Sequence, residues 1–108
     1  MSKVVRRNAP FLRLLVATAS KSQRKGLLDT ITNDQLKALT EVIFNLLRGV
    51  IAITPSYRNQ LRKQKKLIRL LGDKSVSPKR KRVALCRKGS VIAVLLKSVE
   101  PALNSLLT

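Results

Sequence analysis

The chain has 108 residues, 44% of them hydrophobic, and it carries 23 lysines and arginines against 5 acidic residues, a formal net charge of +18. This length and apolar content allow one compact domain with a modest core, and they exclude a second independent domain and a chain that is disordered throughout. The charge would make a compact body repel itself, so it indicates a polyanionic partner: nucleic acid, an anionic membrane surface or an acidic protein.

Two short helices are predicted in the first 28 residues. Asn8 is a candidate N-cap, followed by a proline in the first turn, for a helix that we expect to end near Ala19. Ser20 or Ser22 can cap a second helix, which runs through Leu28. The same segment contains seven basic residues and no acid, a composition that resembles an organelle transit peptide.

A third and central helix is predicted over residues 33–48. Thr32 and Gln35 have the spacing of a capping box, and Gly49 is a typical end signal. Between these signals apolar residues recur at steps of three and four, which directs one stripe toward a core. The stripe consists of Leu36, Leu39, Val42, Ile43, Leu46 and Leu47. The β-branched residues 50–53 that follow form a link too short to require a sheet.

Two further helices start with a hydroxyl residue followed by proline. Thr54-Pro55 begins a fourth helix that is expected to end at Gly72, and Ser77-Pro78 begins a fifth that ends before Gly89. We expect these two helices to form a hairpin around residues 73–76.

The last segment, residues 90–108, is dominated by Val, Ile and Leu, and Pro101 is expected to kink it or to restart its helix. We expect residues 91–107 to pack in the core or to mediate self-association. The chain thus divides into a helical half over 1–54, a basic helical hairpin over 55–89 and an apolar helix over 90–108. These form one all-α domain, a compact bundle of about five to six short helices.

The basic hairpin carries two thirds of the net charge, because residues 55–89 contain thirteen bases and one acid. On one continuous helix over 57–71, the basic side chains would fill an arc of roughly 160° opposite the apolar ones. At the start of the fifth helix, backbone N–H groups would add to the attraction of four consecutive bases for phosphate. The candidate nucleic-acid-binding residues are Arg58, Arg62, Lys63, Lys65, Lys66, Arg69, Lys79, Arg80, Lys81, Arg82, Arg87 and Lys88.

The residue types in the basic hairpin indicate how it would bind. Asn59 and Gln60 are the amides that face away from the packing side, too few to read base edges in a major groove. The three aromatic residues, of which Phe11 and Phe44 are expected in the core, supply no stacking platform for single strands. We therefore expect recognition of the phosphate backbone without sequence preference, with duplex DNA favoured over RNA.

Catalytic and metal-binding residue types are scarce. The chain has no histidine, and its single cysteine, Cys86, excludes an internal disulfide. The five carboxylates have no spacing suited to metal binding or acid–base work. The neighbouring Arg82 and Arg87 predict a lowered pKa for the Cys86 thiol, but without a base we expect only a small, partly buried residue. The chain is thus expected to be no enzyme and to use no cofactor or metal.

Two alternatives explain the same charge. A structural RNA-binding or ribosome-associated protein would also contact phosphates through shape. A membrane-active protein would insert the apolar helix and hold anionic headgroups with the basic hairpin. A membrane partner is not expected, however, since no uncharged stretch approaches the roughly eighteen residues of a membrane span.

Two runs of the sequence resemble a known group of proteins. They are FLRLLVATASKSQRKGLLDTITNDQLKALTEVIFNLLRG and TPSYRNQLRKQKKLIRLLGDKSVSPKRKRVALCRKG, which together cover most of the chain. In these runs the chain resembles the small basic proteins of adintoviruses and Polinton (Maverick) elements, which are large DNA elements that encode their own capsids. The resemblance implies a virion-core protein that condenses double-stranded DNA, located in the virion core or the host nucleus; an organelle is the alternative that the N-terminal composition suggests.

The chain departs from this group after the basic hairpin. There the group has an apolar tail of the Gly-Gly-Phe-Leu type, reminiscent of the condensing core peptide of adenoviruses. Lys88-Gly89-Ser90-Val91 stands at that place here. The resemblance therefore covers the helix starts and the charge runs, and it leaves the function of the tail open.

Overall fold

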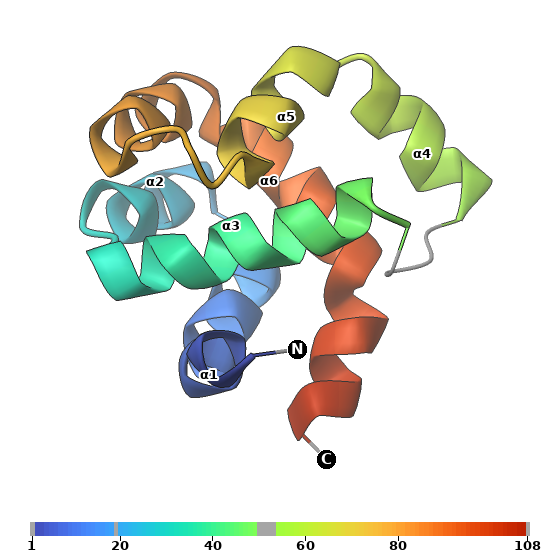
Figure 1. Cartoon of the computed structure of the whole chain (residues 1–108), viewed down its shortest axis with the longest axis horizontal. Coiled ribbons are helices and arrows are strands. Elements are labelled where there is room, and N and C mark those ends of the chain that lie inside the picture. Colours follow the sequence, from blue (N-terminus) through green and yellow to red (C-terminus); the bar gives the residue numbers. More distant parts are fainter. Residues whose placement is uncertain (1, 19, 50–53, 108) are drawn as a thin grey trace.

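Helix α3 is the central element of the computed structural model, which describes residues 2–18, 20–49 and 54–107 (Figure 1). The predicted capping box fixes its start, since the Gln35 N–H donates to Thr32 Oγ1 at 3.1 Å and the Thr32 N–H donates to Gln35 Oε1 at 2.9 Å. The helix is capped at Arg48, and Gly49 follows with a φ of 76°, the left-handed conformation that glycine adopts readily. Both predicted ends of this helix are confirmed.

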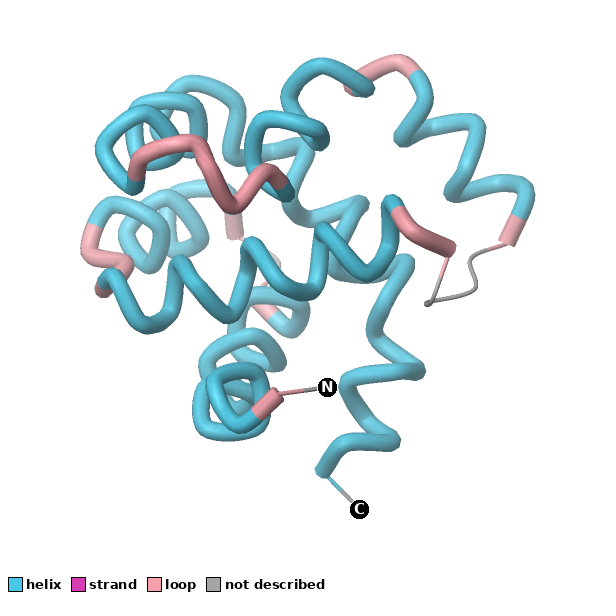
Figure 2. The backbone as a smooth tube through the Cα atoms, viewed as in Figure 1, coloured by secondary structure: helices cyan, strands magenta, loops and turns pink. Residues whose placement is uncertain are grey.

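The described part of the chain is all-α and contains no strand, as the sequence predicts (Figure 2). Helices α1, α5 and the start of α6 pack against α3, while α2 and α4 pack against α6. The helices are α1 (Lys3–Ala17), α2 (Lys21–Asp29), α3 (Asn33–Leu47), α4 (Pro55–Arg62), α5 (Lys65–Gly72) and α6 (Pro78–Leu107). The buried members of the predicted α3 stripe are Leu36, Leu39, Val42, Ile43 and Leu46, whereas Leu47 is exposed.

Helix α1 starts earlier than the sequence predicts, and the assignment of Asn8 as its N-cap is wrong. Ser2 caps the helix, with Ser2 Oγ accepting from the Val5 N–H at 3.5 Å. Asn8 lies inside the helix, and its Nδ2 donates to Asp34 Oδ2 at 2.8 Å. This bond joins α1 to the first turn of α3. Local sequence signals could not predict it, because the partner of Asn8 is distant in sequence. The predicted cap of α2 is correct, since Ser20 Oγ accepts from the Gln23 N–H.

The predicted fourth helix is in fact two helices, α4 and α5, with a turn at Lys63 and Gln64 between them. Its predicted start is correct, since Thr54 is the N-cap and proline is the first helical residue. A continuous helix would hold Arg62 and Lys66 one turn apart, and like charges at that spacing destabilise a helix. Because α4 packs on α6 and α5 packs on α3, the turn lets the two halves bury their apolar side chains against different helices.

Helix α6 continues through Gly89 and Pro101, where the sequence predicts an end and a kink or restart. A glycine inside a helix costs about 1 kcal/mol relative to alanine. The burial of apolar side chains beyond Gly89 compensates for this cost, because Ile92, Leu95 and Leu96 are all 0% exposed. The basic helix and the apolar helix of the sequence analysis are thus one element, and the expectation that the apolar part packs in the core is confirmed for these three side chains.

Helices α5 and α3 touch through backbone at Gly72. A Cβ atom added there would lie 2.9 Å from Ile43 Cγ2 and 3.3 Å from the Phe44 backbone nitrogen, so a larger residue would require Ile43 or the backbone of α3 to shift. Phe44 is half-buried at this contact, with Lys74 Nζ 4.5 Å and Arg48 Cζ 5.3 Å from its ring centroid. It therefore lies beneath two cations rather than inside the core as predicted, whereas Phe11 packs against the core.

An ion pair joins the second turn of α1 to the first turn of α3. Arg7 donates from Nη2 to Asp34 Oδ1 at 2.6 Å and from Nε to Oδ2 at 2.9 Å. The hydrogen bonds from Arg7 and then from Asn8 lower the pKa of Asp34 to about 2. Asp34 lies in the first turn of α3, and its hydrogen-bond partners Arg7 and Asn8 come from α1.

Replacing Leu95 by alanine should reveal how far the apolar part of α6 contributes to the core. We expect Leu95→Ala to lower the free energy of unfolding by about 2–5 kcal/mol, because it leaves a cavity among buried side chains. Leu47→Ala, at a leucine that is 47% exposed, should cost less than about 1 kcal/mol. Urea denaturation measures both values, and equal losses would contradict the packing of α6 described above.

The low pKa of Asp34 should make the stability depend on pH. Its carboxyl has an ordinary pKa of 3.8 and a folded-state pKa of about 2, so its stabilising contribution is present above about pH 4 and is lost as the pH falls toward about 2. Asp34→Asn should therefore lower the Tm near pH 7 but converge with the unchanged protein near pH 2. Glu100→Gln removes an exposed carboxylate and serves as the control in the same thermal unfolding series. A constant Tm difference down to about pH 2 would refute this assignment.

Candidate nucleic-acid interface

Helices α4 and α5 and the first turns of α6 lie along one side of the molecule, away from the two ends of the chain (Figure 1). Nine of the twelve predicted contact residues are exposed on these helices. We call this set the basic face: Arg58, Arg62, Lys63, Lys65, Lys66, Arg69, Lys79, Arg80 and Arg87.

Asp73, in the loop between α5 and α6, is the one acidic residue among residues 55–89. Its Oδ1 accepts from Ser75 Oγ at 2.6 Å and from the Ser75 N–H at 2.9 Å. These hydrogen bonds are the main cause of its lowered pKa, and the charges of Lys81 and Arg80 add to the effect. The carboxylate therefore orders the loop that leads into α6, and within the described residues it forms no salt bridge with the basic face.

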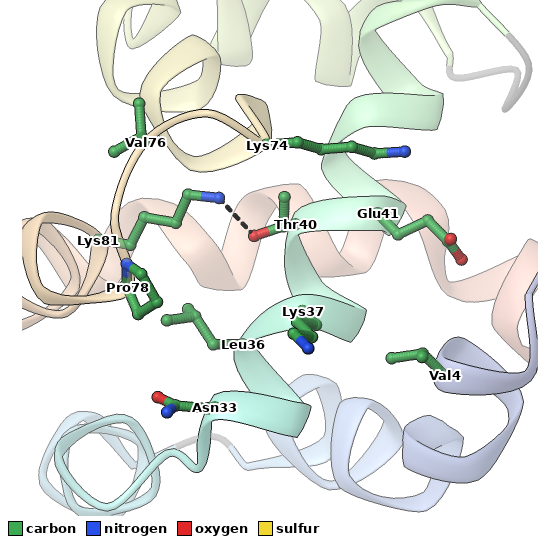
Figure 3. A pocket seen from close by; sticks show the side chains of 10 residues that line it. All are labelled: Val4, Asn33, Leu36, Lys37, Thr40, Glu41, Lys74, Val76, Pro78 and Lys81. Carbon is green, nitrogen blue, oxygen red and sulfur yellow. Dashed lines mark hydrogen bonds between the residues drawn. The ribbon is translucent and has the colours of Figure 1, made fainter.

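Lys81 does not belong to the basic face, so this predicted phosphate contact is wrong. Its side chain turns toward α3, is 4% exposed and donates from Nζ to Thr40 Oγ1 at 2.8 Å (Figure 3). Burial lowers the pKa of Lys81, and the charge of Asp73 partly opposes that shift. The periodicity of α6 explains the difference, because one of four consecutive bases must fall on the side that packs against the rest of the protein.

Arg82 also points inward, so its predicted role is corrected as well. Its guanidinium donates to the backbone carbonyl of Ile31 and to Asn33 Oδ1, and it is half-buried. It thereby holds the turn between α2 and α3 against α6. Lys88, the remaining predicted residue, has a side chain outside the part that the structure describes.

A groove of about 510 Å³ opens in the basic face between α5 and α6. Cations and apolar side chains from both helices line it. The cations are Lys66, Lys79, Arg80 and Arg87, and the apolar residues are Leu67, Leu70, Val83 and Ala84. This apolar part of the surface was not predicted from the sequence, although Val83, which is 48% exposed, occurs between the bases of α6. The groove adds apolar contact area to the charges of the basic face.

Cys86 is exposed rather than partly buried, and its pKa is raised rather than lowered. Its Sγ donates to Asp29 Oδ1 at 3.3 Å, and this hydrogen bond is the main cause of the raised pKa. Lys25, which pairs with Asp29 at 2.9 Å, opposes the shift. The predicted effect of the arginines on α6 is outweighed because an acid of α2 is the closest charged group to the thiol.

The fold and this surface define the protein as a small all-α protein with one strongly basic side. Comparison with models of protein families, with curated proteins and with solved structures gives no match. The described residues include no group of three or more histidine, cysteine or acidic side chains placed to hold a metal ion. None of the helices in the described ranges has the length and apolar character that a transmembrane segment requires.

Two neighbouring arginines of α6 should behave in opposite ways when they are replaced. Arg82→Ala removes hydrogen bonds to the turn between α2 and α3, so we expect it to lower the free energy of unfolding by about 1–3 kcal/mol. Arg80→Ala removes an exposed member of the basic face and should change that free energy by less than about 0.5 kcal/mol. Chemical denaturation of the two variants measures the difference. Equal stability of both would return Arg82 to the set of candidate phosphate contacts.

Proposed function

We propose that this protein binds double-stranded DNA through its phosphate backbone, without sequence preference, and that it neutralises or condenses the bound DNA. One observation carries the proposal: nine exposed cations occupy adjoining helices on one side of the molecule, with Asp73 as the one acid in that part of the sequence. Such a surface attracts a polyanion through many weak contacts, each of which releases a condensed counterion from the DNA.

The groove in the basic face supports contact with a nucleic-acid backbone. Its cations suit phosphates, and its apolar side chains suit the sugars between them. The break between α4 and α5 places the cations on two short helices, so the contacts are not confined to one straight line. These properties favour recognition of backbone shape.

The positions of the aromatic side chains favour a duplex over a single strand. Phe11 packs against the core, Phe44 is covered by two cations and Tyr57 is half-buried. A protein that binds single strands usually stacks bases on exposed aromatic rings. None of these three rings is an exposed platform, so binding without base stacking fits the surface better.

The biological setting of this proposal rests on the resemblance to adintovirus and Polinton proteins. A charge-neutralising protein of the virion core, also present in the host nucleus, would use the basic face in the proposed way. A structural RNA-binding protein is the alternative that uses the same residues, since A-form RNA also presents rows of phosphates. Competition between duplex DNA and duplex RNA of equal length for the same protein distinguishes the two. The membrane-active alternative is less well supported, because Ile92, Leu95 and Leu96 would have to leave the core to insert.

The proposal predicts a steep dependence of DNA affinity on salt. If six to nine cations of the basic face contact phosphates, log affinity should fall against log salt with a slope of roughly −5 to −8. Replacing Arg62, Lys66 and Arg69 together by alanine should weaken binding to unrelated sequences alike and flatten the slope by about three units. Fluorescence anisotropy with labelled duplexes at several salt concentrations measures both quantities.

A matched triple variant controls for the loss of net charge. Arg13, Lys21 and Lys37 are exposed on α1, α2 and α3, away from the basic face, and replacing them by alanine removes the same three charges. We expect this variant to keep a slope within about one unit of the original value. A shallow slope in the unchanged protein, or equal flattening in the two triple variants, would place the binding surface elsewhere.

A further inference from the structure

A second cavity, of about 550 Å³, lies on the other side of the first turn of α6, between α1, α3 and the loop that joins α5 to α6. The proposed DNA contacts do not use it. Apolar side chains and polar ones both line it, and three lysines are among the polar ones (Figure 3). The apolar residues that matter here are Val4, Leu36 and Val76, and the lysines are Lys37, Lys74 and Lys81.

Lys81 is the unusual member of this lining. Its ammonium group has three N–H donors, and within the described residues its hydrogen-bond partner is the neutral hydroxyl of Thr40, with no carboxylate at salt-bridge distance. Burying a charged group with so little compensation is unfavourable, so Lys81 is not explained by stability of the fold. A buried lysine in a cavity is a typical feature of a ligand site.

Asp73, whose charge acts on Lys81, and Glu41, which lines the same cavity, both accept hydrogen bonds from serines. Asp73 accepts two hydrogen bonds from Ser75. Glu41 lines the cavity, but its Oε2 accepts from Ser2 Oγ at 2.6 Å and from the Ser2 N–H at 3.2 Å. Figure 3 shows the Glu41 carboxylate pointing away from the Lys81 ammonium. Asp73 thus attracts Lys81 only through space, and within the described residues the Lys81 ammonium keeps N–H donors that no carboxylate of the protein accepts.

We propose that this cavity binds a small amphiphilic carboxylate, whose head group accepts hydrogen bonds from Lys81 and whose apolar body lies against Leu36, Val4 and Val76. One buried ammonium group matches one carboxylate charge, and Lys37 and Lys74 add positive potential at the exposed part of the lining. A phosphate group has three strong acceptor oxygens and would need more buried donors than Lys81 and Thr40 supply. The volume is within the range of roughly 300–1,000 Å³ that is usual for small-ligand sites.

The probes that test this class of ligand are hexanoate, acetate, hexan-1-ol and inorganic phosphate, each titrated into the full chain and followed by NMR. Hexanoate should saturate the site with a Kd of about 1 mM or below. Acetate lacks the apolar body and hexan-1-ol lacks the charge, so each should bind at least about tenfold more weakly. If acetate or phosphate binds as tightly as hexanoate, the cavity is not a site for an amphiphile and the proposal fails.

Lys81→Met removes the ammonium group and its charge and keeps an unbranched apolar side chain that is one atom shorter. It should weaken hexanoate binding at least about tenfold, leave hexan-1-ol binding unchanged and not lower the Tm, because it removes a poorly compensated buried charge. Lys97→Met, at an exposed position of the same helix, should bind hexanoate as the unchanged protein does. Equal hexanoate affinity in the Lys81 variant, or an equal loss in the Lys97 variant, overturns the proposal.

A measurement on the unchanged protein keeps the test independent of how the Lys81 variant folds. The side-chain nitrogen signal of Lys81 should shift on addition of hexanoate and remain unshifted with hexan-1-ol. No shift of that signal at saturating hexanoate overturns the assignment of Lys81 as the carboxylate-binding group. DNA binding does not enter this readout, so failure of the carboxylate site and failure of the proposed function can be told apart.

Discussion

Burial of the apolar stripe of α3 positions the remainder of the protein. The helices α1, α5 and α6 contact this stripe from different sides, and each buries its own apolar side chains in doing so. Leu39, Val42 and Ile43 are at most 1% exposed, so the stripe is closed to solvent. The basic face depends on this packing, since α5 contacts α3 closely at Gly72 and carries Lys65, Lys66 and Arg69 on its outer side. A chain of such high charge keeps most of its cations on the surface because α3 supplies one apolar surface on which several helices assemble.

Features that depend on neighbours in sequence were predictable, and features that depend on distant neighbours were not. The capping box at Thr32, the start at Thr54-Pro55 and the glycine after α3 are local signals, and each stands where it was predicted. The assignment of Asn8 as a cap was wrong because its partner, Asp34, belongs to another helix and is distant in sequence. The continuation of α6 through Gly89 likewise depends on side chains that become buried only when the helix reaches α1 and the core.

The same limit applies to the candidate site. Charge density along the sequence identified the basic face, because nine of the predicted residues need only a helix and an exposed side to be placed there. It could not distinguish Arg80 from Lys81 and Arg82, which are adjacent in sequence but face different surroundings. Lys81 and Arg82 bind protein groups from α3 and the turn before it, and these contacts exist only in the folded chain. The sequence indicates that these bases lie on one helix. The packing of α6 against α3 and the turn before it determines which of them are exposed.

The crowding of like charges on the basic face has a consequence for the free protein. Nine cations share one side of a body whose principal extents are about 31, 30 and 28 Å, so they repel one another in the folded state. Dissolved ions screen that repulsion and stabilise the fold, whereas the same ions weaken attraction to any polyanion. Folding and polyanion binding therefore respond to ionic strength with opposite signs. At low ionic strength any polyanion that binds this face would replace salt as the source of countercharge, and its binding would then stabilise the folded chain.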